Sequence, residues 1–460
     1  MNCIYADDSR FMKDSDSEII QAAVDYAVES GVREVVIPRV NPRTGEEVWN
    51  IEKAILLPSD ILVIIDNAHL RMADGVFDNM FRNKIVHTEE EHYIENEQHD
   101  IRIKGLGSAT IDGGKLNGLC EQSHRDEPGK HPPMTVNLLV FFSNVRNFEI
   151  SGIHFVNSRW WALCFFYCRM GHLHNLCFSN HGTMENQDGI DLRVGCNQII
   201  IENITGITGD DTIALTAIPL TYTQKCREVK GKDWDIHDVI IRNVISSSHG
   251  CGIVRLLCED GAKVYSVIAE NILDTARSIN GASFIIGDRS DFFAREKGVQ
   301  MGDMKDITIR NVRTCAHKGI SLAGPCENML IENFSIFGKC NTGILFHENF
   351  KASNVTIRNF VYDPYPDYAD CLFKCKCGAD AFEDMKAVTF RSKSLNYVFR
   401  GSQFPVEDFR YEEPKEGFAT EDFGKPISSY GRYFRYFCGE EITCRPKDNR
   451  FDGTIEEDDI

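Results

Sequence analysis

The chain has 460 residues, of which 42% are hydrophobic and 26% are charged, and its formal net charge is -19 at pH 7. This negative charge argues against nucleic acid and against an anionic membrane surface as partners, because both need basic patches. The composition is typical of a folded soluble protein, and no apolar run approaches the roughly 18 residues of a membrane span.

The first element expected in chain order is a helix over residues 14–31. Its apolar residues recur at helical spacing, the run Asp14-Ser15-Asp16-Ser17 offers N-caps, and Gly31 ends it. Strands are expected at 34–38 and 61–65, followed by a polar loop over 79–100. We expect the helix to cover the open end of a solenoid, because an uncovered end exposes apolar side chains and unpaired strand edges.

A short sequence motif, called here the repeated phrase, then recurs along the chain. It consists of alternating apolar residues followed by a polar residue, Asn and another apolar residue. It is clear at 199–204 (IIIENI), 239–244, 267–272, 307–312, 329–334 and 355–360, with a degenerate copy at 148–153. From Asn243 onwards the steps between the Asn residues are 28, 40, 22 and 26 residues. A period of about 22 to 28 residues in strand-like units without room for helices predicts a parallel β-helix.

The fold class predicted is therefore all-β: a single-stranded, right-handed parallel β-helix with an N-terminal capping helix. We expect one domain over residues 1–460, with coils from about 100 to 400 and an acidic tail from about 445 to 460. The corner Asn suits a left-handed turn and can bond a neighbouring backbone amide, which predicts a ladder along the stack. A β-sandwich with coincidental Asn turns remains the alternative.

Two further insertions are expected, at 216–235 and 289–303. Loops on a solenoid tend to gather on one face and form the walls of a cleft.

The 17 cysteines are odd in number and irregular in spacing, and several lie in apolar, strand-like segments. Those segments hold Cys164, Cys168, Cys177, Cys251 and Cys258. This pattern predicts reduced thiols inside the coils. Together with a first stretch that lacks the basic and apolar regions of a secretory signal, it predicts a cytoplasmic location. A metal cluster at Cys371, Cys375 and Cys377 is the less favoured alternative, because no second pair at zinc-ligand spacing accompanies them.

Three carboxylates and a histidine recur at the spacing of the coils. Asp188 lies 22 and 23 residues before Asp210 and Asp211, and His249 falls one further coil along once the 216–235 insertion is discounted. Turn-capping explains a single Asp, and Asp191 or Asp188 alone would be a turn residue. It does not explain a consecutive pair in register with a third carboxylate, a set that glycoside hydrolysis uses as acid and base.

These residues carry a resemblance to a known family. The run Ser158-Arg159-Trp160-Trp161, the run 186–191 (NQDGID), the run 209–215 (GDDTIAL) and Ser248-His249-Gly250 resemble the family 28 glycoside hydrolases, the polygalacturonases and their relatives. The resemblance implies a right-handed parallel β-helix and inverting hydrolysis of α-linked glycans, usually pectic ones from the cell wall.

The resemblance also assigns roles to residues. It implies that Asp210 is the general acid, that Asp188 and Asp211 position and deprotonate water, and that His249 orients the acid. An inverting site then predicts acid and base carboxylates roughly 6.5 to 9.5 Å apart.

Substrate binding is expected from Asn186, Arg255 and Arg289. The basic Arg-Ile-Lys of the family would fall near 283–288, where this chain reads SFIIGD. Arg255 and Arg289 are therefore the candidates to hold a substrate carboxylate, because a guanidinium can do so from several directions. No metal or other cofactor is expected. Trp160-Trp161 and Phe165-Phe166-Tyr167 are expected to be core more than sugar-stacking residues.

The function predicted is hydrolysis of short, α-linked, uronate-containing oligosaccharides, exo-acting because the three loops close one end of the cleft. One alternative is a uronate lyase or epimerase with Arg255 or Lys263 as base and carboxylates that hold calcium. The other is a β-helix that binds glycan without catalysis. The oligomeric state, the sugar and the linkage stay open.

Overall fold

The computed structural model describes most of residues 3–401 and two short strands beyond them. The described residues are 3–120, 123, 126–127, 130–180, 182, 186–219, 228–275, 281–288, 296–365, 367–369, 371–382, 384–387, 390–392, 397–401, 443–445 and 450–452. The chain divides into two compact units, residues 1–240 and 241–460, with the boundary inside β18 (Ile236–Ser248).

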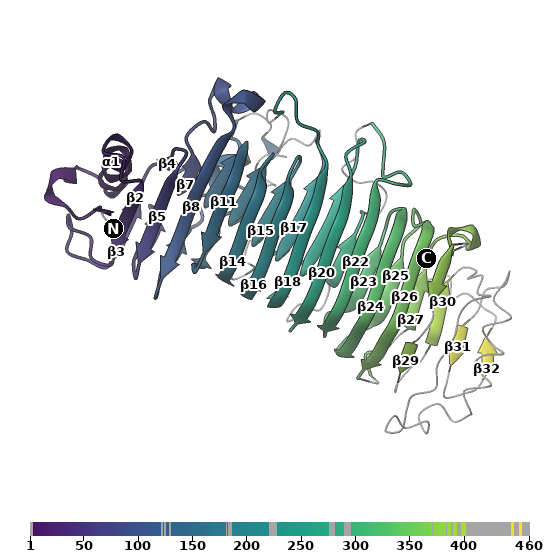
Figure 1. Cartoon of the computed structure of the whole chain (residues 1–460). Helices are drawn as coiled ribbons and strands as arrows, with labels where there is room; N and C mark the ends of the chain where they lie inside the picture. The colour runs from purple at the N-terminus through teal and green to yellow at the C-terminus, as the bar shows by residue number, and fades with distance from the viewer. Residues whose placement is uncertain are drawn as a thin grey trace. The chain divides into compact units, whose positions relative to one another are not determined.

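The first unit consists of parallel strands that return to the same sheets coil after coil (Figure 1). One set pairs in the order β1 (Ile4–Tyr5), β2 (Glu34–Pro38), β5 (Ile61–Asp66), β8 (Gln98–Leu106), β11 (Val145–Ser151), β14 (Arg169–Ser179) and β16 (Asn197–Thr208). A second runs β3 (Val48–Ile51), β6 (His69–Met72), β9 (Thr110–Asp112) and β12 (His154–Val156), and joins β14. A third runs β4 (Ile55–Leu57), β7 (Phe81–Asn83), β10 (Val140–Ser143), β13 (Leu163–Phe166), β15 (Ile190–Arg193) and β17 (Ile213–Ala217).

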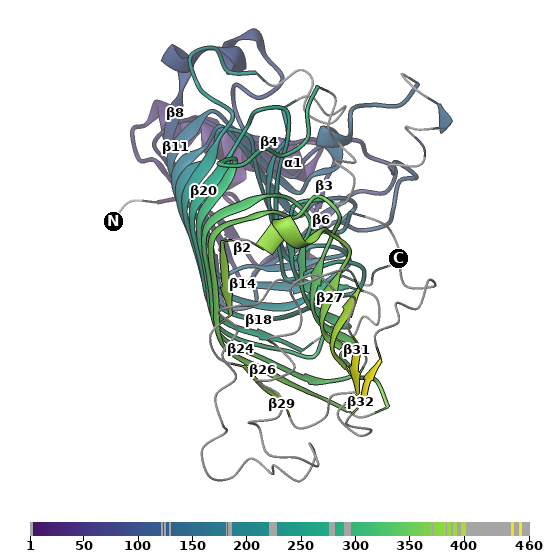
Figure 2. The ribbon, with the colours of Figure 1, turned by 90° about the vertical axis from the view of Figure 1, so that its right-hand side faces the viewer.

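The second unit repeats this arrangement with longer strands. One sheet contains β20 (Val264–Asp274), β22 (Met304–Thr314), β24 (Cys326–Gly338) and β26 (Ala352–Pro364), followed by β28 (Met385–Ala387) and β29 (Phe390–Ser392). The other contains β19 (Val254–Cys258), β21 (Ala282–Ile286), β23 (Lys318–Leu322), β25 (Thr342–Phe346), β27 (Cys371–Cys375) and β30 (Tyr397–Gly401). Figure 2 shows β24 and β26 next to each other, with β27 in the other sheet. The parallel β-helix is confirmed.

The predicted corners are formed by asparagines in the left-handed region. Asn271, Asn311 and Asn333 have φ between 53° and 57°. Each donates its side-chain amide to the Asn of the coil before, at 3.3, 3.1 and 3.0 Å, and Asn359 continues the row at 3.0 Å. The predicted ladder is thus correct, but its rungs join side chains, whereas a backbone amide was expected.

The interior of the coils is filled by the apolar residues of the repeated phrase. In β16, Ile199, Ile201 and Ile204 are buried and the corner Asn203 is exposed. Aromatic rings stack between successive coils, as Phe334 and Phe360 do with their centroids 5.1 Å apart. Stacking of like residues explains why one copy of the phrase has no stable fold alone.

The predicted capping helix is α1 (Asp16–Glu29), beside β2 in Figure 1. Ser15 is the N-cap, and its hydroxyl accepts the Glu18 N–H at 3.3 Å. Asp16 is fully buried at the first turn, where its carboxylate accepts Asn41 Nδ2, Arg43 Nε and the Asn50 N–H, each at 2.7 Å. Among the described helices, none is long and apolar enough to cross a membrane.

Between residues 3 and 377, the cysteines that the structure describes are free thiols. Cys164, Cys168 and Cys258 are buried as predicted, whereas Cys177 and Cys251 are only half-buried. The thiols at 371, 375 and 377 are buried too, and they belong to none of the candidate metal-binding groups found among the described residues. Burial raises the pKa of Cys377 to about 12, which keeps this thiol protonated.

The prediction that residues 79–100 form a loop is partly wrong. The 79–100 segment contains β7, the start of β8 and the 3-10 turns η2 (Glu89–His92) and η3 (Ile94–Asn96), because these elements are too short to show a period in sequence. Further 3-10 turns are η1 (Ser9–Phe11), η4 (Met134–Asn137) and η6 (Ala379–Phe382). Residues 220–227 and 289–295 of the other two insertions lie outside the described residues, as does 453–460 of the acidic tail. Before that tail, β31 (Thr443–Arg445) pairs with β32 (Arg450–Asp452) antiparallel.

Candidate active site

The predicted acidic residues of the first unit lie on adjacent coils, just before β15 and β17 begin. The Gly189 N–H donates to the Asp211 carbonyl at 3.0 Å, and the Gly209 N–H donates to the Gln187 carbonyl at 2.9 Å. These bonds place Asp188 on the coil next to Asp210 and Asp211. The spacing of 22 and 23 residues is therefore one coil, as predicted.

The three carboxylates differ in exposure. Asp188 and Asp211 are buried, whereas Asp210 is half-buried and accepts the Asn186 N–H at 3.1 Å. One carboxylate oxygen of Asp210 lies within 4.8 Å of one of Asp211. The separation of 6.5 to 9.5 Å predicted for acid and base refers to whole carboxyl groups, and it stays a prediction.

A fourth carboxylate, Asp191, lies beside them and was wrongly interpreted as a turn residue. It lies on β15, pairs in register with Cys164 and Ala214 on the neighbouring strands, and is fully buried. Burial raises the pKa of Asp191 well above its usual value; Arg193 opposes this shift, and Asp211 and Asp210 add to it. The acidic site therefore contains a carboxyl group that favours its protonated form.

Arg193 is a second residue that the sequence reasoning missed. Its guanidinium lies 3.5 Å from Asp191 and 4.4 Å from the centroid of the Trp161 ring, and the side chain is buried. A buried cation at this place reduces the repulsion among the carboxylates. Strand alternation was the available signal, because residues 191 and 193 of one strand point to the same face.

The other residues predicted for the site are His249, Arg255 and Arg289. The first two lie in the second unit. His249 directly follows β18 and is exposed. Arg255 lies on β19 and pairs with Asp288 at 3.4 Å. Arg289 lies outside the described residues.

Loops cover the outer face of the β10–β13–β15 sheet in the first unit. Phe165 points into the coil, where it stacks on Phe148, so the alternating neighbours Cys164 and Phe166 face outward. A hydrophobic cluster buries this outer face and includes Val86, Leu119, Met134, Leu138, Phe141, Trp160, Trp161, Cys164, Phe166, Tyr167, Val194 and Val229. The expected core role of Trp160, Trp161 and Tyr167 is confirmed, and the cluster adjoins the acidic site through Trp161.

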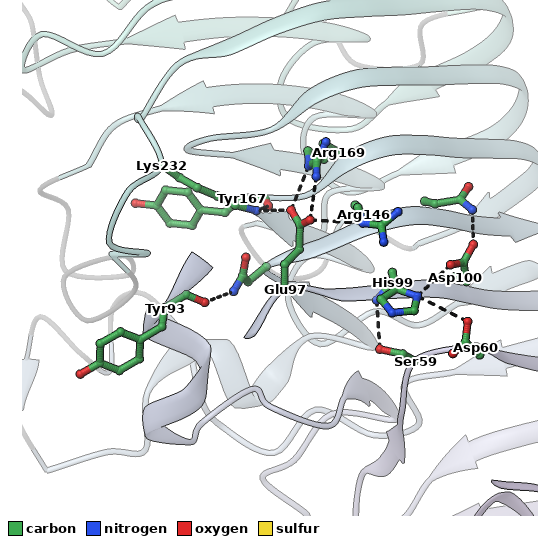
Figure 3. Close-up of polar contacts among 12 residues, drawn as sticks. Ser59, Asp60, Tyr93, Glu97, His99, Asp100, Arg146, Tyr167, Arg169 and Lys232 are labelled. Atoms are coloured by element: carbon green, nitrogen blue, oxygen red, sulfur yellow. Dashed lines mark hydrogen bonds and ion pairs between the residues drawn. The ribbon is translucent and has the colours of Figure 1, made fainter. Parts of the chain in front are cut away.

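Glu97 fastens these loops to the sheet (Figure 3). Its carboxylate accepts two hydrogen bonds from Arg169, at 2.9 and 2.8 Å, and one from Lys232 at 2.7 Å. Lys232 also donates to the Tyr167 carbonyl at 3.0 Å. The segment around 228–235, next to the Asp210-Asp211 coil in sequence, is thereby held against the 94–98 segment.

We expect Glu97→Gln to lower the free energy of unfolding at pH 7 by about 2 kcal/mol, because it weakens charged hydrogen bonds that are nearly buried. Burial alone would raise the pKa of Glu97, but the hydrogen bonds from Arg169 and Lys232 outweigh it and lower the pKa. This stabilisation is therefore present above the usual glutamate pKa and is lost as the pH falls through the lowered one. Denaturant unfolding of both proteins between pH 7 and pH 3 measures it.

The control for this prediction is Glu95→Gln, which changes an exposed carboxylate two residues away. It should leave the unfolding midpoint unchanged at every pH. A Glu97→Gln deficit that stayed constant down to pH 3 would contradict the assigned charge interaction.

Comparisons with known proteins agree with this geometry. Residues 81–231 match the model of glycosyl hydrolases family 28, a segment that contains Asn186, Asp188, Asp210 and Asp211. No curated protein matches the chain in sequence.

Solved structures share the fold at low identity. The family 28 exopolygalacturonase of Yersinia enterocolitica is 13% identical with a TM-score of 0.56, over 89% of this chain and 77% of that one. A hyperthermoactive exopolygalacturonase from Thermotoga maritima is 14% identical with a TM-score of 0.52, over 89% and 92%. The tailspike protein of E. coli bacteriophage HK620, in complex with pentasaccharide, is 13% identical with a TM-score of 0.55, over 85% and 68%.

The β-helix, the acidic site and the family match together define the class of protein: this is a glycoside hydrolase. The resemblance to glycosyl hydrolases family 28 that was predicted from the sequence is confirmed over residues 81–231.

Proposed function

We propose that this glycoside hydrolase cleaves α-linked, uronate-containing oligosaccharides from a chain end, with inversion at the anomeric carbon. The observation that carries the proposal is the placement of Asp188 on the coil next to that of Asp210 and Asp211, inside the segment that matches the family. Two solved structures of the same fold are exopolygalacturonases by their titles, which supports a galacturonate-containing substrate.

In the proposed reaction, Asp210 protonates the glycosidic oxygen as the bond from that oxygen to the anomeric carbon breaks. Asp188 and Asp211 hold a water molecule and accept its proton as its oxygen bonds to the same carbon from the opposite face. One C–O bond is broken and one is formed, and the configuration inverts. Asp210 is the most exposed of the three carboxylates, which suits a group that must reach the leaving oxygen. His249 is assigned to orient the acid, and Asn186, whose N–H already contacts Asp210, is assigned to the substrate side.

Exo action is supported by the covered outer face of the first unit. The loops held by Glu97 and by the hydrophobic cluster bury the described sheet surface beside Trp161 and Arg193, where further sugar residues would otherwise lie. A substrate bound at the carboxylates then has its end near this wall.

The test is a time course of wild-type protein with galacturonate oligomers of three to six residues, together with neutral α-linked oligomers. Release of monomer from the first time point and an inverted anomer, read by NMR, are expected. A retained anomer contradicts the mechanism, early release of intermediate oligomers contradicts exo action, and an ultraviolet-absorbing unsaturated end would indicate a lyase.

A further inference from the structure

A histidine and two aspartates from neighbouring coils of the first unit come together at the starts of β5 and β8 (Figure 3). Asp60 directly precedes β5, and His99 and Asp100 are the second and third residues of β8. One carboxylate oxygen of each aspartate and one imidazole nitrogen all lie within 4.8 Å of one another. The acidic site adjoins a different sheet, that of β15 and β17. This cluster is therefore separate from the residues assigned to catalysis.

The strand register brings the two aspartates together. Ile61 pairs with Ile101 across β5 and β8, so Asp60 and Asp100, which directly precede these residues, are neighbours on adjacent coils. Both have left-handed backbones, with φ of 60° and 56°. Like charges opposite each other on neighbouring strands are destabilising. A positively charged group between the two carboxylates would remove this repulsion.

At other corners of this kind an amide joins one coil to the next. Asn147, on the coil after Asp100, donates its side-chain amide to Asp100 Oδ1. In the second unit, Asn328 donates to Asp306 at 3.1 Å in the same manner. An ionised Asp100 can only accept hydrogen bonds, so it cannot donate to Asp60. The row of side-chain hydrogen bonds is thus interrupted between these two coils.

His99 Nδ1 faces both carboxylates at this interruption. It lies 2.8 Å from Asp100 Oδ2 and 3.4 Å from Asp60 Oδ1. Within the part of the chain that the structure describes, His99 is the ion-pair partner of both aspartates, and an imidazole is charged only when it is protonated. In its neutral form the imidazole offers a lone pair. One nitrogen and two carboxylate oxygens are ligands that zinc accepts in proteins.

Neighbouring groups hold these three ligands in place. The His99 N–H donates to Ser59 Oγ at 3.1 Å, and the Asp60 N–H donates to the His99 carbonyl at 2.9 Å. Because Asn147 donates to Asp100 Oδ1, the other oxygen of this carboxylate is the one that faces His99. Partners of this kind orient the ligands of a metal and raise its affinity.

The distances suit a tetrahedral ion. Bonds of about 2.0 to 2.1 Å place the ligand atoms of such an ion about 3.4 Å apart. His99 Nδ1 and Asp60 Oδ1 already have this separation, and Asp100 Oδ2 would have to move away by about half an ångström. The side chains of His99, Asp60 and Asp100 keep 34%, 53% and 33% of their surface exposed, so water can complete the coordination.

We propose that Asp60, His99 and Asp100 bind a zinc ion, which links the coil of β5 to the coil of β8. The proposal goes beyond the proposed function and does not depend on the substrate or on the catalytic residues. Calcium and magnesium are disfavoured, because they take oxygen ligands and this set includes a nitrogen. The ion stabilises the fold, because the unfolded chain does not hold these ligands together.

The test is calorimetric titration of the chelator-treated full chain with zinc chloride, together with thermal unfolding at each zinc concentration. Asp100→Asn should weaken zinc binding by more than about 100-fold, because loss of a ligand exceeds the roughly 10- to 100-fold typical of an outer partner. The new amide can donate to Asp60 as the other corners do. The metal-free variant should therefore melt no lower than the metal-free wild type, which separates loss of the ion from damage to the fold.

Asp238→Asn is the matched control. His237 Nδ1 lies 2.9 Å from the Asp238 carboxylate, as in the proposed site. The His237 N–H donates to the Cys196 carbonyl at 3.2 Å, which places Gln198 beside Asp238 where the proposed site has a second carboxylate. This variant should bind zinc as the wild type does.

X-ray absorption at the zinc edge identifies the ligands. Nitrogen and oxygen at about 2.0 to 2.1 Å are expected, without the sulfur at about 2.3 Å that binding to a free thiol would give. A sulfur ligand, an affinity that Asp100→Asn leaves unchanged, or equal losses in Asp100→Asn and Asp238→Asn would overturn the proposal. Absence of zinc binding would overturn it too, and would leave protonated His99 as the bridge between the two carboxylates.

Discussion

Asp210→Asn is expected to lower the rate of glycoside hydrolysis by about 10³-fold, the typical contribution of a positioned general acid. The amide cannot donate the proton that the leaving oxygen needs. It has nearly the same shape, and its oxygen can still accept the Asn186 N–H that Asp210 accepts at 3.1 Å. The fold and the affinity for substrate should therefore be preserved. Initial rates of reducing-end release at saturating substrate, with circular dichroism of both proteins, measure the effect.

Asp14→Asn is the control for this experiment, because it makes the same chemical change at an exposed position before α1. Its rate should equal that of the wild type. An Asp210→Asn protein that kept more than a tenth of the wild-type rate would exclude Asp210 as the acid. No reducing-end release by either protein would instead favour a glycan-binding role for the chain.

The largest effect on stability is expected from Asp16→Ala, at about 4 kcal/mol. Asp16 is fully buried and holds three donors from the segment 41–50 to the first turn of α1. Its removal leaves Asn41 and the Asn50 N–H without this acceptor and Arg43 without its charge partner. For a unit of this size the loss corresponds to a fall in the melting temperature of about 10 °C. Thermal unfolding followed by circular dichroism measures it.

Two variants sharpen this prediction. Asp14→Ala, two residues away and exposed, should leave the melting temperature unchanged. Asp16→Asn keeps an acceptor but loses the charge, and should fall between Asp16→Ala and the wild type. If the melting temperature of Asp16→Ala equalled that of the wild type, α1 would not be held to the coils through this carboxylate.

The fold was predictable because the backbone conformation at its corners restricts which residue can stand there. A left-handed corner favours Asn, so the need for one at Asn271, Asn311 and Asn333 is visible in the sequence without any partner. The second asparagine row, in which Asn354 donates to Asn328 at 2.8 Å, was missed because no repeated apolar phrase precedes it. The strand β7 and the turns η2 and η3 were assigned to a loop, since elements of three or four residues carry no readable period.

The site was predictable only where chain spacing determines proximity. One coil separates Asp188 from Asp210, so their placement on adjacent coils follows from the period. The burial of Asp191 and Arg193 depends on loops that cover the outward face of the sheet. The sequence of β15 alone does not indicate that its outward face is buried. The cluster of Asp60, His99 and Asp100 likewise depends on two segments that are distant in sequence and share only the register of neighbouring strands.

The asparagine row has a consequence for how such a chain can change during evolution. Its rungs span 28, 40, 22 and 26 residues, yet each joins the same corner of successive coils. Extra residues are therefore absorbed away from the corner, without a shift in the pairing of the strands. Insertions and deletions can remodel the surroundings of a binding site while the scaffold keeps its alignment, so substrate preference can diverge faster than the fold.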